Sequence, residues 1–308
     1  MFSLQPFVVK MFTKKEAVDF LERSWGVKTV EKKLRSDRKH FLEEIILVIR
    51  GRVPFQLLTF WPMLLISPLK RIFPSLESMK EDCMTGHGGN CTIINFFTVT
   101  LLEALGFSAR LCFAAGSTTI IVNHVVVLVE DLEKKGDLHL VDCGLVLPSF
   151  RAISLNFDQE SPVYQDSFLE YKLIRHNGLI LRMHGSGDII KRNNPPMEGL
   201  DFVVGKWRRY YRFDITNSIS PDEFAASFQV AHLPTTVPPL AAWFPGGRTV
   251  MILVNQLKVE KEDGTFENIM IKSDEEILRY YKKYFPTIRE DTVRQAYFAR
   301  RNQATSKL

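Results

Sequence analysis

The sequence predicts an α+β fold in three parts, in the order helical, antiparallel β and mixed α/β. Apolar residues recur at helical spacing through the first hundred residues, and strand-like runs separated by turn signals begin near Ser108. The last third combines further strand runs with one amphipathic helix. The changes in composition place the parts at residues 1–105, 106–200 and 201–308. With 308 residues, 45% of them apolar, the chain has enough material for a large core.

Three helices are expected in the first part. Thr13 and Glu16 fit a capping box ahead of an apolar helical face. A second helix with the same spacing is expected from Ser36 to Ile49, and Pro54 closes it. The third helix follows a glycine-rich loop, runs from residue 91 to 105 and ends at a glycine, which is a common helix C-cap.

The middle part consists of predicted strands. Apolar and β-branched runs indicate strands at residues 110–114, 120–130, 138–142, 171–175 and 179–183. His176-Asn177-Gly178 joins the last two as a hairpin turn. A polar stretch from Gly185 to Gly199 is expected to be a loop or boundary.

The third part is predicted to mix strands with a helix. Strand runs are expected at residues 208–215 and 248–259, and Glu262-Asp263-Gly264 indicates a hairpin. A helix follows from about Ser273 to Tyr284.

Composition excludes several function classes. Lysine plus arginine exceeds aspartate plus glutamate by 40 − 35 = 5, and the basic residues are scattered, so nucleic acid is not an expected partner, whereas an anionic small molecule is compatible. The four cysteines form no C-x-x-C pair, which predicts neither a zinc site nor a disulfide scaffold and fits a reducing, cytoplasmic setting. The first ten residues lack the features of a signal peptide. Prolines interrupt the longest uncharged run, Val53–Leu69, which favours a buried segment over a membrane span.

Cys91 is the most informative residue. It begins the third predicted helix directly behind Gly88 and Gly89, where unpaired backbone N–H groups and the helix dipole stabilise a thiolate. The alternative is that Cys91 is simply a small buried hydrophobe. That alternative is favoured for the other three cysteines, because Cys112 and Cys143 lie in predicted strands and Cys83 lies in a loop with no base near it in the sequence.

A cysteine nucleophile needs a base, and the base needs an orienting group. His124 stands at the head of a buried strand, and Asp142 ends the next strand along the chain. If residues 131–137 form the hairpin loop between them, the two side chains become cross-strand neighbours. A core histidine bonded to backbone and a strand-end turn aspartate are the alternatives for the two residues taken singly.

The order of these motifs resembles a known family. Gly88-Gly89-Asn90-Cys91, then Asn123-His124-Val125-Val126, then Val141-Asp142-Cys143-Gly144 is similar to the arylamine N-acetyltransferases, thiol enzymes with a Cys-His-Asp triad.

The resemblance extends beyond these three motifs. Val53-Pro54-Phe55-Gln56 is similar to a segment upstream of the family's cysteine. Tyr211-Arg212-Phe213-Asp214, Asp222-Glu223-Phe224 and Pro245–Thr249 resemble its third domain. The match runs in the same order from about residue 14 to 287.

The resemblance implies a cysteine-protease-like core with a β-barrel-like middle domain and a lid-like C-terminal domain. It implies ping-pong transfer of an acetyl group from acetyl-CoA, through Cys91, to an arylamine or arylhydrazine, in a cytoplasmic, xenobiotic-metabolising monomer without a permanent cofactor, metal or membrane attachment. His124 would move protons, and Asp142 would fix its tautomer. Gly246, Gly247 and Arg248 are candidates for CoA binding, as is the basic run Lys206–Arg209.

Three positions depart from the family pattern. His87 stands where the family usually has arginine, Gln56 where it has glutamate, and Leu145 where an aromatic residue is common. If residues 56 and 87 touch, a charged pair has become a hydrogen-bonding pair. These departures leave a non-catalytic relative of the family as one alternative function. A transglutaminase-like or papain-like thiol hydrolase, which would use the same triad, is the other alternative.

Overall fold

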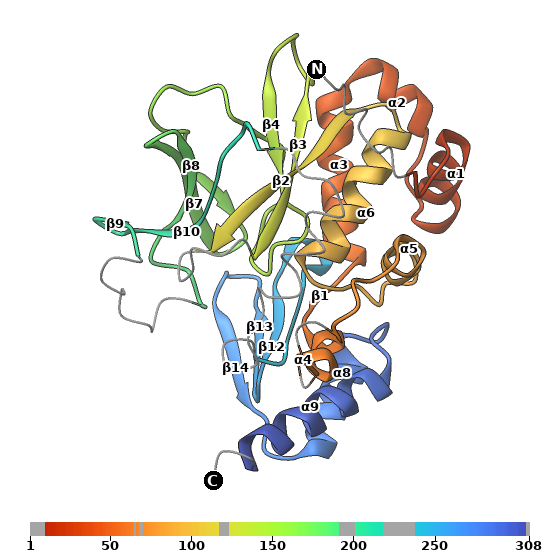
Figure 1. The fold of residues 1–308 in the computed structure, drawn as a ribbon, viewed down its shortest axis with the longest axis vertical. Helices are drawn as coiled ribbons and strands as arrows, with labels where there is room; N and C mark the ends of the chain where they lie inside the picture. The colour runs from red at the N-terminus through yellow and green to blue at the C-terminus, as the bar shows by residue number, and fades with distance from the viewer. Residues whose placement is uncertain are drawn as a thin grey trace.

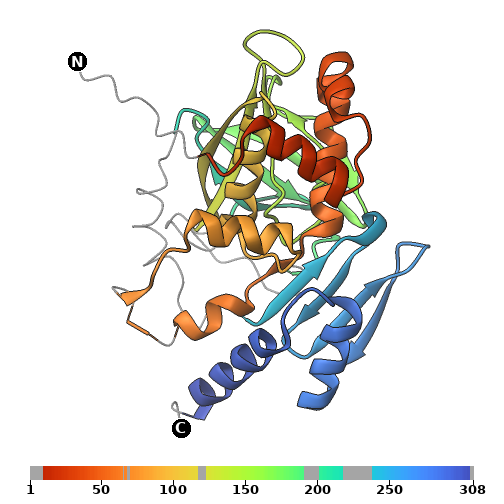
Figure 2. The same ribbon diagram turned by 90° about the vertical axis from the view of Figure 1, so that its right-hand side faces the viewer.

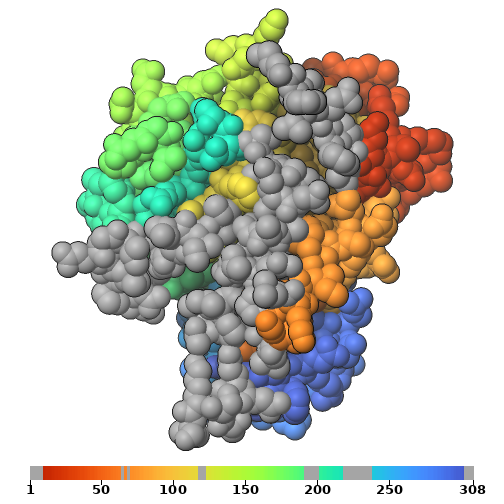
Figure 3. Space-filling view, in the orientation of Figure 1, coloured from red at the N-terminus to blue at the C-terminus, as the bar shows by residue number. Residues whose placement is uncertain are grey.

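The computed structural model describes residues 10–64, 66–67, 70–116, 123–190, 201–217 and 238–305. The N-terminal helices lie along one side of a curled antiparallel sheet, and a smaller sheet with the C-terminal helices lies at one end of both (Figures 1 and 2). In the space-filling view, the sheet strands in green, the N-terminal helices in red and orange, and the C-terminal elements in blue occupy separate parts of one face (Figure 3).

Residue-level capping signals set where the N-terminal helices begin. The Thr13 hydroxyl accepts a hydrogen bond from the Glu16 N–H (3.2 Å) and the Glu16 carboxylate accepts one from the Thr13 N–H (2.7 Å), so the expected capping box is confirmed. The second expected helix starts two residues later than predicted, at Arg38, because the Asp37 carboxylate caps it by accepting from the His40 N–H. The N-terminal helical elements are α1 (Lys14–Asp19), η1 (Phe20–Ser24), α2 (Val30–Ser36), α3 (Arg38–Arg52), η2 (Leu58–Phe60), α4 (Trp61–Leu64), α5 (Leu76–Met84) and α6 (Cys91–Ala104).

Helix α6 is the centre of the helical part. Apolar residues occur on all sides of it, and nearly every residue from Cys91 to Leu102 is buried, as expected for a helix surrounded by protein. It contacts α5 on one side and strands β2 and β3 on the other (Figure 1). Gly106 takes φ +87° just past its end, which confirms the predicted glycine stop.

The larger sheet contains nine strands within the described residues, and all its pairings are antiparallel. Its order is β5-β4-β3-β2-β10-β8-β7-β6, with β9 paired to β10. The strands are β2 (Ser108–Gly116), β3 (His124–Glu130), β4 (Leu138–Val141), β5 (Ile153–Ser154), β6 (Tyr164–Asp166), β7 (Leu169–His176), β8 (Leu179–His184), β9 (Val203–Val204) and β10 (Trp207–Phe213).

Strand β10 joins the larger sheet although it lies beyond residue 200 in the chain. It lies between β2 and β8, with Tyr211 opposite Gly116 and Phe213 opposite Ile180. Its inward residues Tyr211 and Phe213 fill the core under the larger sheet. The segment Tyr211–Phe213 therefore pairs within the larger sheet, because tertiary pairing rather than chain order decides where a strand docks.

The smaller sheet has five strands in the described chain, in the order β1-β11-β12-β13-β14. The expected single strand run at residues 248–259 is a hairpin instead, because Val254 adopts φ +59° and turns the chain. The N-terminal segment contributes β1, so this sheet ties the two ends of the chain together. The elements are β1 (Phe55–Gln56), β11 (Leu240–Trp243), η4 (Pro245–Gly247), β12 (Val250–Leu253), β13 (Gln256–Glu260), β14 (Phe266–Met270), α8 (Asp274–Tyr284) and α9 (Glu290–Thr305).

Turn residues behave as the sequence predicts. Asn177 and Gly178 have φ of +49° and +78° between β7 and β8, and Gly264 has φ +77° between β13 and β14. Ser273 caps α8 at the expected position. No helix in the described part of the chain is both long and apolar enough to cross a membrane.

Candidate active site

Cys91 occupies the first position of α6. Asn90 is the N-cap, and its side-chain oxygen accepts a hydrogen bond from the Ile93 N–H (3.2 Å). The Cys91 side chain is buried, with the residue 6% exposed, and its Sγ lies 3.8 Å from the Asn123 carbonyl oxygen. The thiol therefore meets the chain that leads into β3, at the positive end of the helix.

The loop before Cys91 requires its glycines. Gly88 has φ +71°, and a Cβ there would lie 2.0 Å from the Pro54 carbonyl oxygen. The Gly89 N–H donates to that same oxygen (3.3 Å), and the Gln56 N–H donates to the Gly89 oxygen (2.8 Å). The loop thus lies directly against the Pro54–Gln56 backbone, where a side chain has no room.

His124 and Asp142 are brought together as predicted. His124 is the first residue of β3, Asp142 follows the last residue of the adjacent strand β4, and the His124 Nε2 lies 2.9 Å from the Asp142 Oδ2. The Asp142 side chain is fully buried and that of His124 is 12% exposed. With Nε2 bonded to the carboxylate, Nδ1 is the ring nitrogen available to the Cys91 sulfur.

The charges of these groups support one another. Burial by itself would lower the pKa of His124, but the Asp142 carboxylate and a negative Cys91 sulfur beside the ring raise it to about 10. Burial would raise the pKa of Asp142, yet His124 and a hydrogen bond from Asn95 bring it below its ordinary value. The carboxylate is therefore ionised and the imidazole holds its proton at neutral pH.

Asn95 is a functional candidate that sequence reasoning missed. Its Nδ2 donates to the Asp142 Oδ1 (2.9 Å) and to the Val125 carbonyl oxygen (2.6 Å), while its Oδ1 accepts from the Gly144 N–H (2.9 Å). Asn95 is fully buried and lies one helical turn after Cys91. Its i, i+4 spacing from Cys91 is the feature of the sequence that could have identified it.

Gly144 lets the chain after Asp142 approach α6. A Cβ on Gly144 would lie 2.7 Å from the Cys91 Cα, 2.8 Å from the Cys91 carbonyl oxygen and 2.8 Å from the Asn95 Nδ2. Two of these are backbone atoms of Cys91, so a side chain here must displace Cys91 or Asp142.

We predict that Gly144→Ala destabilises the protein by about 1–3 kcal/mol, because overpacking against backbone cannot relax by side-chain rotation. Gly51→Ala is the matched control, since a Cβ there meets no atom closer than 3.9 Å and the residue lies within α3. Urea unfolding of the two variants compares them. Equal stability of the two variants would show that the contact with Cys91 is not tight.

The other three cysteines differ from Cys91. All are completely buried, and burial raises the pKa of the Cys112 and Cys143 thiols to about 12 and that of Cys83 well above its ordinary value. They remain protonated at neutral pH, in agreement with the packing role expected for them.

The CoA-binding candidates belong to different elements of the fold. Gly246 and Gly247 form the turn η4 with φ of +60° and +78°, and the half-exposed Arg248 pairs with Glu262 (3.1 Å). In the basic run, Lys206 pairs with Glu170 and Arg208 with Asp201. Carboxylates thus already contact three of these cations.

The three departures from the family pattern have individual partners. Gln56 donates from Nε2 to the Gly88 oxygen (3.5 Å) and accepts from the Thr59 N–H (3.1 Å). His87 accepts from the Arg289 N–H at 3.4 Å, and burial together with the Arg289 charge lowers the pKa of His87. Leu145 is buried in the core under the larger sheet. Residues 56 and 87 thus bind different groups.

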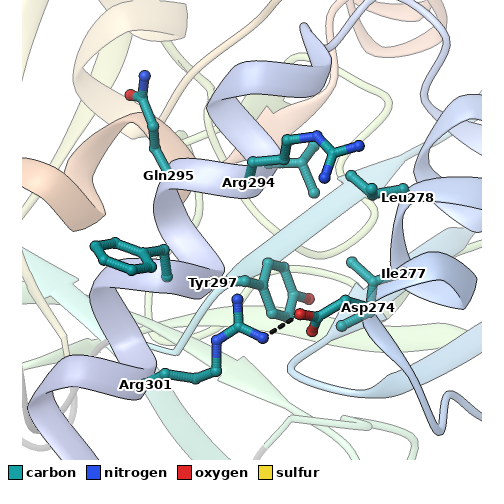
Figure 4. A pocket seen from close by; sticks show the side chains of 9 residues that line it. Asp274, Ile277, Leu278, Arg294, Gln295, Tyr297 and Arg301 are labelled. Carbon is teal, nitrogen blue, oxygen red and sulfur yellow. Dashed lines mark hydrogen bonds and ion pairs between the residues drawn. The ribbon is translucent and has the colours of Figure 1, made fainter.

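A cavity of about 330 Å³ lies between α8 and α9 (Figure 4). Ile277, Leu278 and Tyr297 line it, and an ion pair joins Arg301 to Asp274 at its edge. None of its lining residues belongs to the Cys91–His124–Asp142 group, so this cavity is separate from the thiol.

Comparison with solved structures identifies the architecture. The structure of the Mycobacterium marinum arylamine N-acetyltransferase in complex with CoA matches with a TM-score of 0.69 at 15% sequence identity, covering 90% of this chain and 96% of that one. The chain has the fold of the arylamine N-acetyltransferases. The Mycobacterium smegmatis enzyme (TM-score 0.65, 20% identity, 87% and 91% covered) and the Salmonella typhimurium enzyme (0.61, 17%, 87% and 90%) share this N-acetyltransferase fold.

Sequence comparison adds no relative. A scan against protein-family models finds no match, and a search of curated proteins finds none either. The similarity of this chain to the N-acetyltransferases is therefore a similarity of fold. The sequence-based prediction of that fold is confirmed over about nine-tenths of the chain.

We predict that the His124–Asp142 pair stabilises the protein in a defined pH range. Because the folded-state pKa of His124, about 10, exceeds the ordinary 6.5, its contribution is complete below pH 6.5 and is lost as the pH rises through 10. The lowered pKa of Asp142 makes its contribution present above its ordinary 3.8 and lost as the pH falls. Asp142→Asn should therefore cost most, about 3 kcal/mol, between pH 4 and 6.5.

Denaturant unfolding of Asp142→Asn and the wild type at several pH values measures this difference. Asp158→Asn, which alters an exposed carboxylate, should change stability by no more than about 0.5 kcal/mol at any pH. A cost for Asp142→Asn that does not shrink towards pH 10 would contradict the assigned charge pairing.

Proposed function

We propose that the protein is an acetyl-CoA-dependent N-acetyltransferase that passes an acetyl group through a Cys91 thioester to an arylamine or arylhydrazine. One observation carries the proposal: within an N-acetyltransferase fold, a thiol at the start of α6 adjoins an imidazole that a buried carboxylate holds at 2.9 Å. These residue types in this order can generate and protect a thiolate nucleophile.

The first half-reaction acylates Cys91. The thiolate attacks the acetyl carbonyl carbon of acetyl-CoA, the bond from that carbon to the CoA sulfur breaks, and the departing thiolate takes the proton of the His124 imidazolium. Asp142 keeps the ring oriented with Nε2 towards itself and Nδ1 towards the sulfur atoms. The products are the acetyl-Cys91 enzyme and CoA.

The second half-reaction returns the enzyme to its starting state. The amine nitrogen attacks the thioester carbonyl, His124 removes the proton from that nitrogen, and the carbon–sulfur bond to Cys91 breaks to release the amide. The proton balance closes because the proton that His124 takes from the amine nitrogen replaces the one that left with CoA.

Backbone N–H groups are proposed to stabilise the oxyanion. The N–H groups of Cys91 and Thr92 lie in the first turn of α6, where helix geometry leaves them without an intrahelical acceptor. They point in the direction of the helix N-terminus, where charge develops on the carbonyl oxygen.

The proposed substrates are inferred from the structurally similar enzymes. CoA is bound in the M. marinum structure with this fold, and we infer acetyl-CoA as cosubstrate, with Gly246, Gly247 and Arg248 as candidate contacts. The mechanism requires a reduced thiol, which supports the cytoplasm as the proposed setting. The proposal further takes the protein as a monomer that acts on foreign aromatic amines.

Intact-mass spectrometry tests the proposal. The purified protein incubated with acetyl-CoA alone should gain one acetyl group, about 42 Da, and lose it on addition of an aromatic amine such as aniline. Cys91→Ala should gain nothing, whereas Cys143→Ala, which removes a buried thiol, should still be acylated if it folds.

The alternatives give different results in the same experiment. A thiol hydrolase would show no lasting adduct although Cys91 reacts with an alkylating agent, or would lose the acetyl group to water without an amine. A non-catalytic relative would show neither acylation nor a reactive thiol. Either result would overturn the proposed transfer.

A further inference from the structure

The segment 143–149, which directly follows Asp142, is held by two buried arginines. Arg50, from α3, donates from Nη1 to the Cys143 carbonyl oxygen at 2.6 Å and from Nη2 to the Leu147 carbonyl oxygen at 2.7 Å. Its guanidinium also lies 4.0 Å from the centre of the Phe244 ring. One side chain thus binds both the first residue after Asp142 and a residue four further along.

Arg182, from β8, binds the other end of the same segment. Its Nη1 donates to the Ser149 hydroxyl oxygen and its Nη2 to the Pro148 carbonyl oxygen, both at 3.2 Å. Its Nε donates to the His184 Nε2 at 3.0 Å, and the guanidinium lies 4.0 Å from the centre of the Tyr171 ring. The segment is therefore fixed from two elements that are far apart in the chain.

Burial of two guanidinium groups is costly unless something compensates for their charge. Arg50 is 1% exposed and Arg182 is fully buried, and within the described residues their hydrogen bonds to the segment go to neutral oxygens. Burial lowers the pKa of Arg50 to about 10, and the negative charge of Asp142 opposes that effect. The Asp142 carboxylate thus compensates buried positive charge on the arginines as well as on His124.

We propose that Arg50 and Arg182 are positioning residues of the thiol site, which fix the segment 143–149 and thereby hold the Asp142 carboxylate against His124. Asn95 binds the start of the same stretch from α6, through Asp142 and the Gly144 N–H. If either arginine can no longer hold its acceptors, the segment 143–149 can shift relative to α6 and β3. The hydrogen bond between Asp142 and His124 then weakens. The effect of the two arginines on acetyl transfer rests on the proposed function, whereas their contacts with the segment 143–149 do not.

Several ionisable groups lie around His124, Asp142 and the two arginines. Their charges contribute to the pH dependence of the thiol site. His124 is bordered by Cys91 from α6 and by the Tyr211 ring from β10, whose centre lies 5.1 Å away. The groups that act on Asp142 or on the two arginines include His124, Arg50, Arg182, Cys143, Asp166, Tyr171, Tyr210 and Tyr211. His184 also contacts Arg182, and Asp188 in turn holds His184 at 2.8 Å.

The test uses Arg50→Lys and Arg182→Lys in the full chain. Lysine retains the positive charge but cannot bind two acceptors in a fixed fork, so the substitution isolates positioning from charge. Arg175→Lys is the matched control, because Arg175 also binds two backbone carbonyls, those of Phe157 and Leu155, but far along the chain from Asp142 and at an exposed site.

The rate of Cys91 alkylation by iodoacetamide is measured from pH 4 to 9, with Cys91→Ala as the blank. With Asp142 shifted, the His124 imidazolium is held less firmly beside the Cys91 sulfur and stabilises a thiolate there less well. We expect the rate at pH 6 to fall about tenfold in each arginine variant, which corresponds to a shift of about one pH unit, while Arg175→Lys follows the wild type. Rate profiles of Arg50→Lys and Arg182→Lys that coincide with that of Arg175→Lys overturn the proposal.

Circular dichroism and thermal unfolding establish that each variant is folded at the temperature of the rate measurement. If either lysine variant does not fold, Ser149→Ala replaces it, because it removes one acceptor of Arg182 and leaves both guanidinium groups in place. The rate at pH 6 should then fall in the same direction by a smaller factor, and an unchanged rate overturns the proposal. Alkylation needs no acetyl-CoA, so failure of the positioning role and failure of the acetyl transfer are observed separately.

Discussion

The three hydrogen bonds of Asn95 are the constraint on which the thiol site depends. Its amide joins α6 to the Val125 carbonyl of β3, to the Asp142 carboxylate and to the Gly144 N–H. A single side chain one turn after Cys91 therefore fixes the helix that carries the thiol relative to both strands that carry its partners. The close approach of Gly144 to the Cys91 backbone is possible only because this bridge and the missing Cβ act together.

Burial makes the charges of this site effective. The carboxylate of Asp142 is removed from water, so its interaction with the His124 ring is not screened, and the ring keeps its proton well above neutral pH. The same burial would be unfavourable for an isolated carboxylate, so the hydrogen bond from Asn95 and the neighbouring positive charges are needed to keep it ionised. The contacts that stabilise the folded protein at this site therefore also determine which of its groups carry a proton.

The smaller sheet contacts the loop that contains Gly88 and Gly89 and precedes Cys91. Strand β1 pairs with β11 on one side, and the Gln56 N–H binds the Gly89 oxygen on the other. Near the start of α9, Arg289 contacts His87, and a Cβ on Gly86 would lie 3.2 Å from the Thr287 side chain. The C-terminal elements therefore support the loop that precedes Cys91, although Arg289 and His87 are 202 residues apart in the chain.

The sequence by itself determined the local elements and the three chemical groups of the site. The Thr13 capping box, the helix that starts at Cys91 and the turn at Asn177 follow from short-range hydrogen bonding and φ preferences, which neighbouring residues decide. His124 and Asp142 could be paired because one hairpin connects their strands.

Only the tertiary structure decided the long-range partners. The place of β10 in the middle sheet, the turn at Val254 and the contacts of Asn95 and Arg50 depend on which distant segments pack together. A buried polar side chain must find its partner wherever the fold provides one, and that partner leaves no periodic signal in the sequence.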